Sequence, residues 1–278
     1  MVAGDLNCRR CGYNLRGLAY AGRCPECNTP VEVSAQSDAL RFGDPIWLGR
    51  LCTGAQIVMA NRLLYIAWSV LRLTTSSLLR AYWPFDFFNI ILHGLALTGW
   101  WLLTSPDPGG LGEATYGRSR EFSRVASLVS MGIALIWHIR RNSALPPMAD
   151  LIAAVSVLGF GVIPVIGEVT RYRYLAGLAD RIPNDAIAAS ARQFAIAMPI
   201  VAGFNLLTGI VSTIAMELRG KVTIPFGVLG CSALLSILLL VLMNLLTFNL
   251  LRRLHTKVRL QANLAVHAWA KHDSTQRS

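Results

Sequence analysis

Four cysteines near the N-terminus carry the strongest chemical signal in the sequence. Cys8 and Cys11 form one Cys-x-x-Cys pair, and Cys24 and Cys27 form a second. Each pair can build a tight turn whose amides point at the sulfurs, and two facing turns offer tetrahedral thiolate coordination. We therefore predict a small β zinc ribbon over residues 1–35. A structural metal would stabilise it, because so short a segment cannot bury a sufficient core.

Two other chemistries use the same four cysteines. Two disulfides are the first alternative, but they need an oxidising compartment. Iron is the second, because the two pairs are also similar to the knuckles of rubredoxins, which are spaced farther apart. Gly12 and Asn28 follow the two pairs, and both residue types tolerate the left-handed conformation that such turns require. Cys52 and Cys231 have no cysteine neighbour at ligand spacing and are expected to be small buried hydrophobes.

The strings CRRCGYNLRGL at 8–18 and CPEC at 24–27 resemble the opening of a group of bacterial membrane proteins with a short N-terminal zinc ribbon. The stretch YLAGLADRIPNDAIA at 174–188 is a second similarity. The resemblance implies a multi-spanning protein of the bacterial inner membrane that binds a metal at its N-terminus. It implies no activity.

The composition favours a membrane protein. The chain has 278 residues, of which 54% are hydrophobic and 15% charged, whereas a soluble domain carries about 25% charged residues. Apolar runs of about 20 residues cross a bilayer as helices. We predict an all-α membrane domain with about six transmembrane helices, at residues 56–73, 85–103, 122–139, 151–169, 194–216 and 226–251.

The first of these spans is the weakest, because residues 56–73 include Arg62 and Arg72. Residues 47–61 could instead form an interfacial helix. The predicted organisation is a ribbon at 1–35, a linker or interfacial segment at 36–55, a transmembrane domain at 56–251 and a basic cytoplasmic tail at 252–278.

The net charge of +11 is interpreted as a topology signal, and nucleic acid is a disfavoured partner. With six spans and a cytoplasmic N-terminus, far more Lys and Arg residues lie on the cytoplasmic side than outside, as the positive-inside rule requires. Both termini are therefore expected in the cytoplasm. No signal-peptide core precedes the cysteines, so the first apolar segment should act as an uncleaved anchor.

The longest cytoplasmic loop, residues 171–193, is expected to contain a helix. Tyr172, Leu175, Ala179 and Ile182 fall on one helical face. This helix could lie on the lipid headgroups, or it could be a docking site for the ribbon or another partner.

Three ionisable residues at membrane depth form a possible polar site: Arg62, His93 and Glu168. An Arg62–Glu168 pair would neutralise both charges. Two further polar residues, Asn205 and Asn244, can hydrogen-bond across helices. The fourth span reads VLGFGVIPVIGE at 157–168, and its glycines and proline could break the helix there.

No catalytic motif is present, which favours a role other than catalysis without excluding an enzyme. Two functions follow from the sequence. In the first, the ribbon is a membrane-anchored interaction module whose loop 13–23 presents Arg16, Tyr20 and Arg23 to a protein or acidic partner. In the second, the spans form a path for a small solute or ion past the interrupted fourth helix, Glu168 and His93. The partner, the substrate and the oligomeric state are not encoded in any motif.

Overall fold

The protein is a bundle of long helices preceded by a short cysteine-containing segment. The computed structural model describes residues 1–35, 39–75, 83–108, 110, 112–143, 145–182, 185–217 and 226–274. The helices are α1 (Val31–Ala35), the 3-10 helix η1 (Leu40–Phe42), α2 (Pro45–Thr75), α3 (Trp83–Leu103), α4 (Glu113–Asn142), α5 (Pro147–Phe160), α6 (Val162–Asp180), α7 (Asp185–Glu217) and α8 (Phe226–Ser274).

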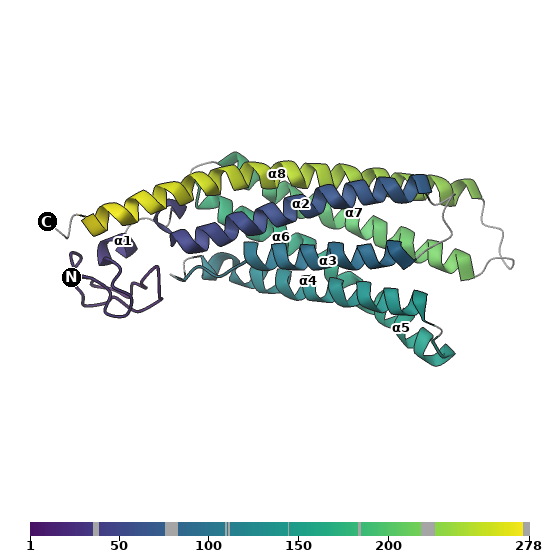
Figure 1. Ribbon diagram of the computed structural model, residues 1–278, viewed down its shortest axis with the longest axis horizontal. Coiled ribbons are helices and arrows are strands. Elements are labelled where there is room, and N and C mark those ends of the chain that lie inside the picture. The colour runs from purple at the N-terminus through teal and green to yellow at the C-terminus, as the bar shows by residue number, and fades with distance from the viewer. Residues whose placement is uncertain are drawn as a thin grey trace.

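Six long helices pack side by side in a closed order. Neighbours in the packing run α2, α3, α4, α6, α7, α8 and back to α2, so these helices form a ring. Figure 1 shows them antiparallel, with both chain termini and the cysteine segment at the same end. Helix α5 directly precedes α6 in the chain, and it diverges from the bundle at the end opposite the cysteine segment. The ring matters for function because side chains from distant parts of the sequence meet in its interior.

Local sequence signals account for where the helices begin and break. The Asp44 carboxylate accepts hydrogen bonds from the amides of Ile46 and Trp47, at 2.7 and 3.3 Å, and thereby caps α2. Between α5 and α6 the helix is interrupted at Gly161. Pro164 explains this break, because its ring lacks an amide hydrogen and clashes with the carbonyl four residues earlier.

Glycines set the closest helix approaches within the ring. A Cβ atom added at Gly54 of α2 would lie 2.3 Å from the backbone nitrogen of Leu103 at the end of α3. A Cβ atom at Gly167 of α6 would lie 2.4 Å from the Cβ of Ala126 in α4. Small residues at such crossings let helix backbones approach closely, as in membrane helix pairs.

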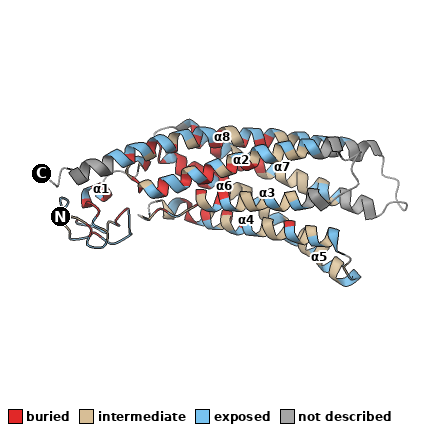
Figure 2. Cartoon of the chain, in the orientation of Figure 1, coloured by how far each residue is buried: buried red, intermediate tan, exposed pale blue. Residues whose placement is uncertain are grey.

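Burial is concentrated at the end of the bundle that lies next to the cysteine segment, as Figure 2 shows. Large apolar side chains are exposed along the rest of the helices; Ile196, Ile200 and Leu238 are 69%, 68% and 67% exposed. Contiguous apolar surface of this extent is unusual on a soluble monomer. A bilayer is the environment that such a surface fits.

Among the described residues, four helical segments are long and apolar enough to cross a membrane, and a fifth is apolar but shorter. The four are Glu113–Arg140, Pro147–Asp180, Ala186–Val211 and Leu234–His267, and the shorter one is Phe87–Leu103. The helical architecture agrees with the predicted all-α bundle, and the length and apolar composition of these helices fit a membrane protein. The count of six spans remains a prediction, because α2 is not among these segments. Its arginines, including Arg50 and Arg62, lower its hydropathy.

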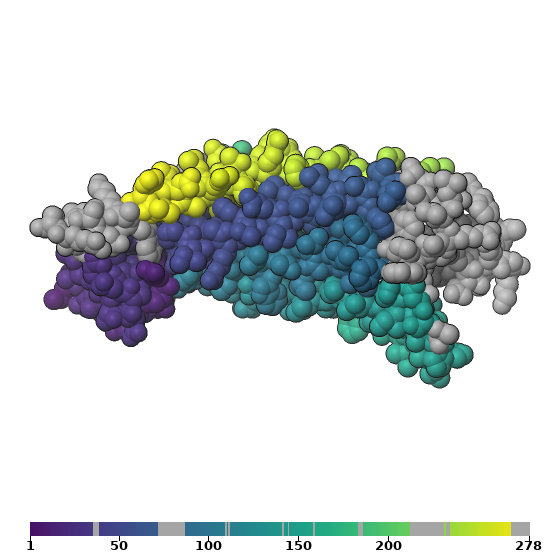
Figure 3. Space-filling model, in the orientation of Figure 1, coloured from purple at the N-terminus to yellow at the C-terminus, as the bar shows by residue number. Residues whose placement is uncertain are grey.

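The boundaries between the segments differ in detail from the sequence-based scheme. Residues 45–55, assigned above to the linker, are the first turns of α2. The basic tail from residue 252 is continuous with the last span, as one helix α8. In residues 1–35 no strand is formed; two isolated bridges, Asn7 with Asn14 and Arg23 with Pro30, take the place of the expected β ribbon. We call residues 1–35 the cysteine module, and Figure 3 shows it projecting from one end of the bundle.

Candidate metal centre and intramembrane polar site

The two cysteine turns of the module have the same backbone pattern. In the first, the amide of Gly12 donates to the carbonyl of Cys8, and the amide of Cys8 donates to the carbonyl of Tyr13. In the second, the amide of Asn28 donates to the carbonyl of Cys24, and the amide of Cys24 donates to the carbonyl of Thr29. Gly12 and Asn28 have φ angles of +77° and +59°, which confirms that both turns need a left-handed residue.

The four thiols converge on one point. Their Sγ atoms all lie within 4.8 Å of one another, and the Cys8–Cys27 and Cys11–Cys24 pairs are each 3.5 Å apart. A tetrahedral zinc ion with Zn–S bonds of about 2.3 Å separates its sulfurs by about 3.8 Å. All four thiols are free. The donor set and its spacing therefore fit a single metal ion, which Cys8, Cys11, Cys24 and Cys27 would hold; iron fits the same donors.

The thiols differ in how readily they lose a proton. Burial raises the pKa of Cys8, and it raises the pKa of Cys11 to about 12. At Cys27 burial acts in the same direction, but hydrogen bonding with Thr29 and with the neighbouring thiols outweighs it and lowers the pKa to about 7. Without a cation, Cys8 and Cys11 stay protonated at neutral pH. Metal binding must therefore displace protons, and it weakens as the pH falls.

The module has its own small core and rests on the helical bundle. Val2, Leu15 and Val31 are buried together with the sulfurs of Cys8 and Cys24. The module also meets the loop between α3 and α4. In that contact a Cβ atom added at Gly12 would lie 3.3 Å from the carbonyl oxygen of Pro108, and one at Gly110 would lie 3.7 Å from Asn7 Nδ2. Part of the module surface is thus covered by the protein itself.

Other residues of the module are open to solvent. Tyr13 and Tyr20 are 41% and 48% exposed, and Arg16 is exposed beside Asp5. Arg23 is half-buried and donates to the carbonyl of Asn28 at 2.9 Å. The predicted recognition loop therefore presents two aromatic rings and Arg16, while Arg23 also supports the second cysteine turn.

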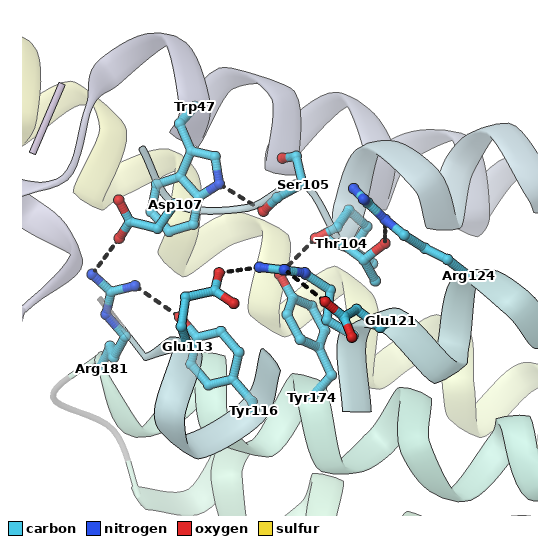
Figure 4. A network of polar contacts seen from close by, with 12 residues as sticks. Trp47, Thr104, Ser105, Asp107, Glu113, Tyr116, Glu121, Arg124, Tyr174 and Arg181 are labelled. Atoms are coloured by element: carbon cyan, nitrogen blue, oxygen red, sulfur yellow. Dashed lines mark hydrogen bonds and ion pairs between the residues drawn. The ribbon is translucent and has the colours of Figure 1, made fainter. Parts of the chain in front are cut away.

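A network of buried polar groups holds the α3–α4 loop on which the module rests (Figure 4). Arg181 forms an ion pair with Asp107 at 2.9 Å and donates to the Tyr116 hydroxyl at 2.9 Å. The Trp47 indole donates to the carbonyl of Ser105 at 2.9 Å, which ties the start of α2 to the same loop. The loop is thereby fixed to α2, α4 and the end of α6.

The predicted loop helix at 171–193 has a different role from either of those expected. Residues 171–180 are the last turns of α6, and Tyr172, Leu175, Ala179 and Ile182 are buried in the main core. The expected common face is confirmed. However, the residues of this face pack inside the bundle, and they neither lie on headgroups nor dock the module. The expected stop at Pro183 lies outside the described residues.

The three residues of the predicted intramembrane site come together inside the ring. Arg62 from α2, His93 from α3 and Glu168 from α6 line one cavity of about 190 Å³, which we call the His93 cavity. His93 Nδ1 lies 2.8 Å from the carbonyl oxygen of Asn89 in its own helix. A second cavity of about 320 Å³ lies beside it and is lined by Arg62, Glu168 and Asn205; we call it the Asn205 cavity.

The expected Arg62–Glu168 ion pair is not formed. Glu168 pairs with Arg171, one turn later in α6, through Oε1. Arg62 Nη1 donates to Asn244 Oδ1 in α8 at 3.1 Å. The prediction of hydrogen bonds across helices is confirmed for Asn244, and also for Asn205, whose Oδ1 accepts from the Ser236 hydroxyl.

Arg171 is the site residue that the sequence analysis missed. Its side chain is only 8% exposed, donates to the Ser127 hydroxyl at 2.9 Å and lies over the ring of Trp100 at 5.2 Å. By its position at the start of the predicted cytoplasmic loop 171–193, Arg171 is expected to be a topology charge on the cytoplasmic side. A signal was available, because Glu168 and Arg171 are three residues apart on one helix and such residues face the same way.

No protein-family model matches this sequence, and no similar curated protein or solved structure was found. The coarse assignment thus rests on the chain itself: apolar helices that fit a membrane, and a four-cysteine cluster that can hold a metal ion.

Proposed function

We propose that this protein is a membrane-anchored interaction or regulatory protein, whose zinc-stabilised module binds a protein partner in the cytoplasm. The proposal is carried by the exposed residues Tyr13, Arg16 and Tyr20, which lie on the segment between the two cysteine pairs and are therefore held in place by the cysteine cluster. Tyrosine and arginine are favoured at the centres of protein interfaces. An exposed arginine on the same segment as two exposed tyrosines fits a partner with acidic groups.

Site-specific photo-crosslinking tests this function. A photo-reactive amino acid at Tyr20, in the full-length protein in its native membrane, should give one discrete protein adduct. The Arg16→Ala variant should reduce the yield of that adduct, because it removes the exposed cation from the same segment. Arg118 is an exposed residue near the start of α4, at the same end of the bundle, and a photo-reactive group there is the matched control.

An adduct that forms equally from Tyr20 and Arg118, or one that is insensitive to Arg16→Ala, would reflect random proximity and contradict the proposal. Failure to form any adduct at Tyr20 would also count against it, since the ring is exposed in the structure.

We infer further that the chain crosses the bacterial inner membrane six times, with both termini in the cytoplasm. The antiparallel order of the six ring helices supports this number, because it returns the chain to the cysteine end after each pair of helices (Figure 1). A basic groove supports the orientation. It is lined by Arg252, Arg253 and Lys257 of α8 and lies at the start of α7. Such clusters suit the anionic inner leaflet.

Thiol labelling in intact cells checks this topology. Asn142→Cys, at the end of α4 distant from the module, should react with a membrane-impermeant maleimide without permeabilisation. Arg118→Cys, at the other end of the same helix, should react only after the membrane is opened. The reverse pattern would place the module outside, where the reducing conditions assumed for the thiols are absent.

A second candidate function is passage of a small solute through the ring. The observation that favours it is the pair of adjoining cavities beside the broken α5–α6 segment, which reach both His93 and Glu168. Binding sites in transporters are often formed where a membrane helix is interrupted, because the break frees backbone groups.

A further inference from the structure

The two cavities inside the ring share a wall, and the charged groups around the two cavities together are unbalanced. Arg62, Tyr65, Pro164 and Glu168 line both of them. Glu168 is already paired with Arg171. Among the described residues, no carboxylate lies within ion-pair distance of Arg62, whose interaction is a single hydrogen bond to neutral Asn244. Two guanidinium groups therefore face one carboxylate, and Arg62 carries the surplus positive charge.

The Arg62 guanidinium is also incompletely hydrogen-bonded. Its Nε is buried and has no partner within the described parts of the chain. A partly buried cation without a counter-charge is costly where little water reaches it. One bound anion in the cavity would offset this charge. Glu168 Oε2 also lacks a partner, but Arg171 already offsets the charge of that carboxylate.

The shape of the Asn205 cavity indicates what else the ligand carries. Beyond Arg62, Glu168 and the two asparagines, its lining is mainly apolar and includes Met198, Val201 and Leu240. Its volume of about 320 Å³ is at the lower end of the range for small-molecule sites, about 300–1,000 Å³. The space thus combines a few polar groups, among them the Arg62 guanidinium, with an apolar remainder.

We propose that the Asn205 cavity binds an amphiphilic anion: one carboxylate or phosphate monoester on a short aliphatic chain, with the anionic group on Arg62. The apolar chain lies among Met198, Val201 and Leu240. This proposal names a ligand class for the second candidate function. It rests on that function only because both use the same cavity. Binding can occur without transport, so a binding measurement separates the two.

The test is a thermal-shift titration of the full-length protein in a non-ionic detergent, since a ligand that binds the folded state raises its melting temperature. Octanoate and octyl phosphate are the probes, and they distinguish the two anionic groups. Octanol tests whether the aliphatic chain binds without a charge. Octylammonium tests whether a ligand of the opposite charge binds. We expect saturable stabilisation by at least one anion and none by the other two probes. Equal shifts with octanol or octylammonium would overturn the proposal.

Variants identify the site. Arg62→Gln should weaken anion binding by at least about tenfold, the size expected for loss of a charged hydrogen-bond donor. Arg173→Gln removes the same charge from an exposed position of α6 and should leave the affinity unchanged. Glu168→Gln should leave it equal or increase it, because a repelling charge is removed.

Loss of anion binding in Glu168→Gln would show that the carboxylate recognises the ligand and would overturn the assignment. Unchanged binding in Arg62→Gln would do the same. If Arg62→Gln does not fold, Arg62→Lys keeps the charge but loses the guanidinium. It should then bind the anion more weakly than the parent protein but still more tightly than it binds octanol. If Arg62→Lys binds the anion and octanol equally tightly, the proposal is contradicted.

Discussion

Cys11→Ser is expected to reduce the metal content from one ion per chain to none and to unfold the cysteine module. Cys11 is the exposed member of the cluster, so a serine there changes the packing of the module little, and the effect reports the lost ligand. The loss is large because structural zinc sites contribute about 10–16 kcal/mol of apparent binding free energy. Elemental analysis of the purified protein measures the metal, and limited proteolysis of residues 1–35 measures the folding.

Cys52→Ser is the matched control, because Cys52 lies in α2 and is not part of the cluster. It should keep both the metal and the protease resistance. Lowering the pH should release the metal from the parent protein, since protons compete for Cys8 and Cys11, whose pKa values are raised by burial. A red sample containing iron would refute zinc but keep the site. A folded, metal-free module would refute both.

Asp107→Ala should lower the free energy of unfolding by about 3–5 kcal/mol, the usual cost of removing one partner of a buried ion pair. The Asp107 and Arg181 side chains are 2% and 5% exposed, so the remaining guanidinium would stay buried without its counter-charge. The same substitution should loosen the α3–α4 loop on which the module rests. Unfolding by a denaturing detergent in mixed micelles gives the stability, and protease sensitivity near residue 107 reports the loop.

The exposed ion pair between Arg192 and Asp180 provides the comparison. These side chains are 61% and 46% exposed, so Arg192→Ala should cost only about 0–1 kcal/mol. The double variant Asp107→Ala with Arg181→Met should recover part of the stability lost in Asp107→Ala, because no charge is left buried. Equal losses at the buried and the exposed pair would show that burial does not decide the effect.

The sequence by itself determined the features that depend on near neighbours. The geometry of each cysteine turn is local, because Gly12 and Asn28 supply the left-handed residue directly after each pair. Convergence of the four sulfurs followed from two such turns in a short segment. The apolar helices could equally be predicted from the sequence, since runs of about 20 apolar residues favour a bilayer whatever their neighbours are. The break before Pro164 is also a local effect.

The tertiary structure alone decided how the polar residues pair. The rotation of each helix about its axis and the order of the ring depend on close contacts such as Gly54 with Leu103. No local pattern encodes those contacts. These contacts bring Glu168 into an ion pair with Arg171, whereas Arg62 donates a hydrogen bond to the neutral Asn244 of α8. They also turn Arg171, a topology charge by its position in the sequence, into an interior residue. The surplus charge between the cavities arises because the ring brings together α2, α6 and α8, which are far apart in the chain.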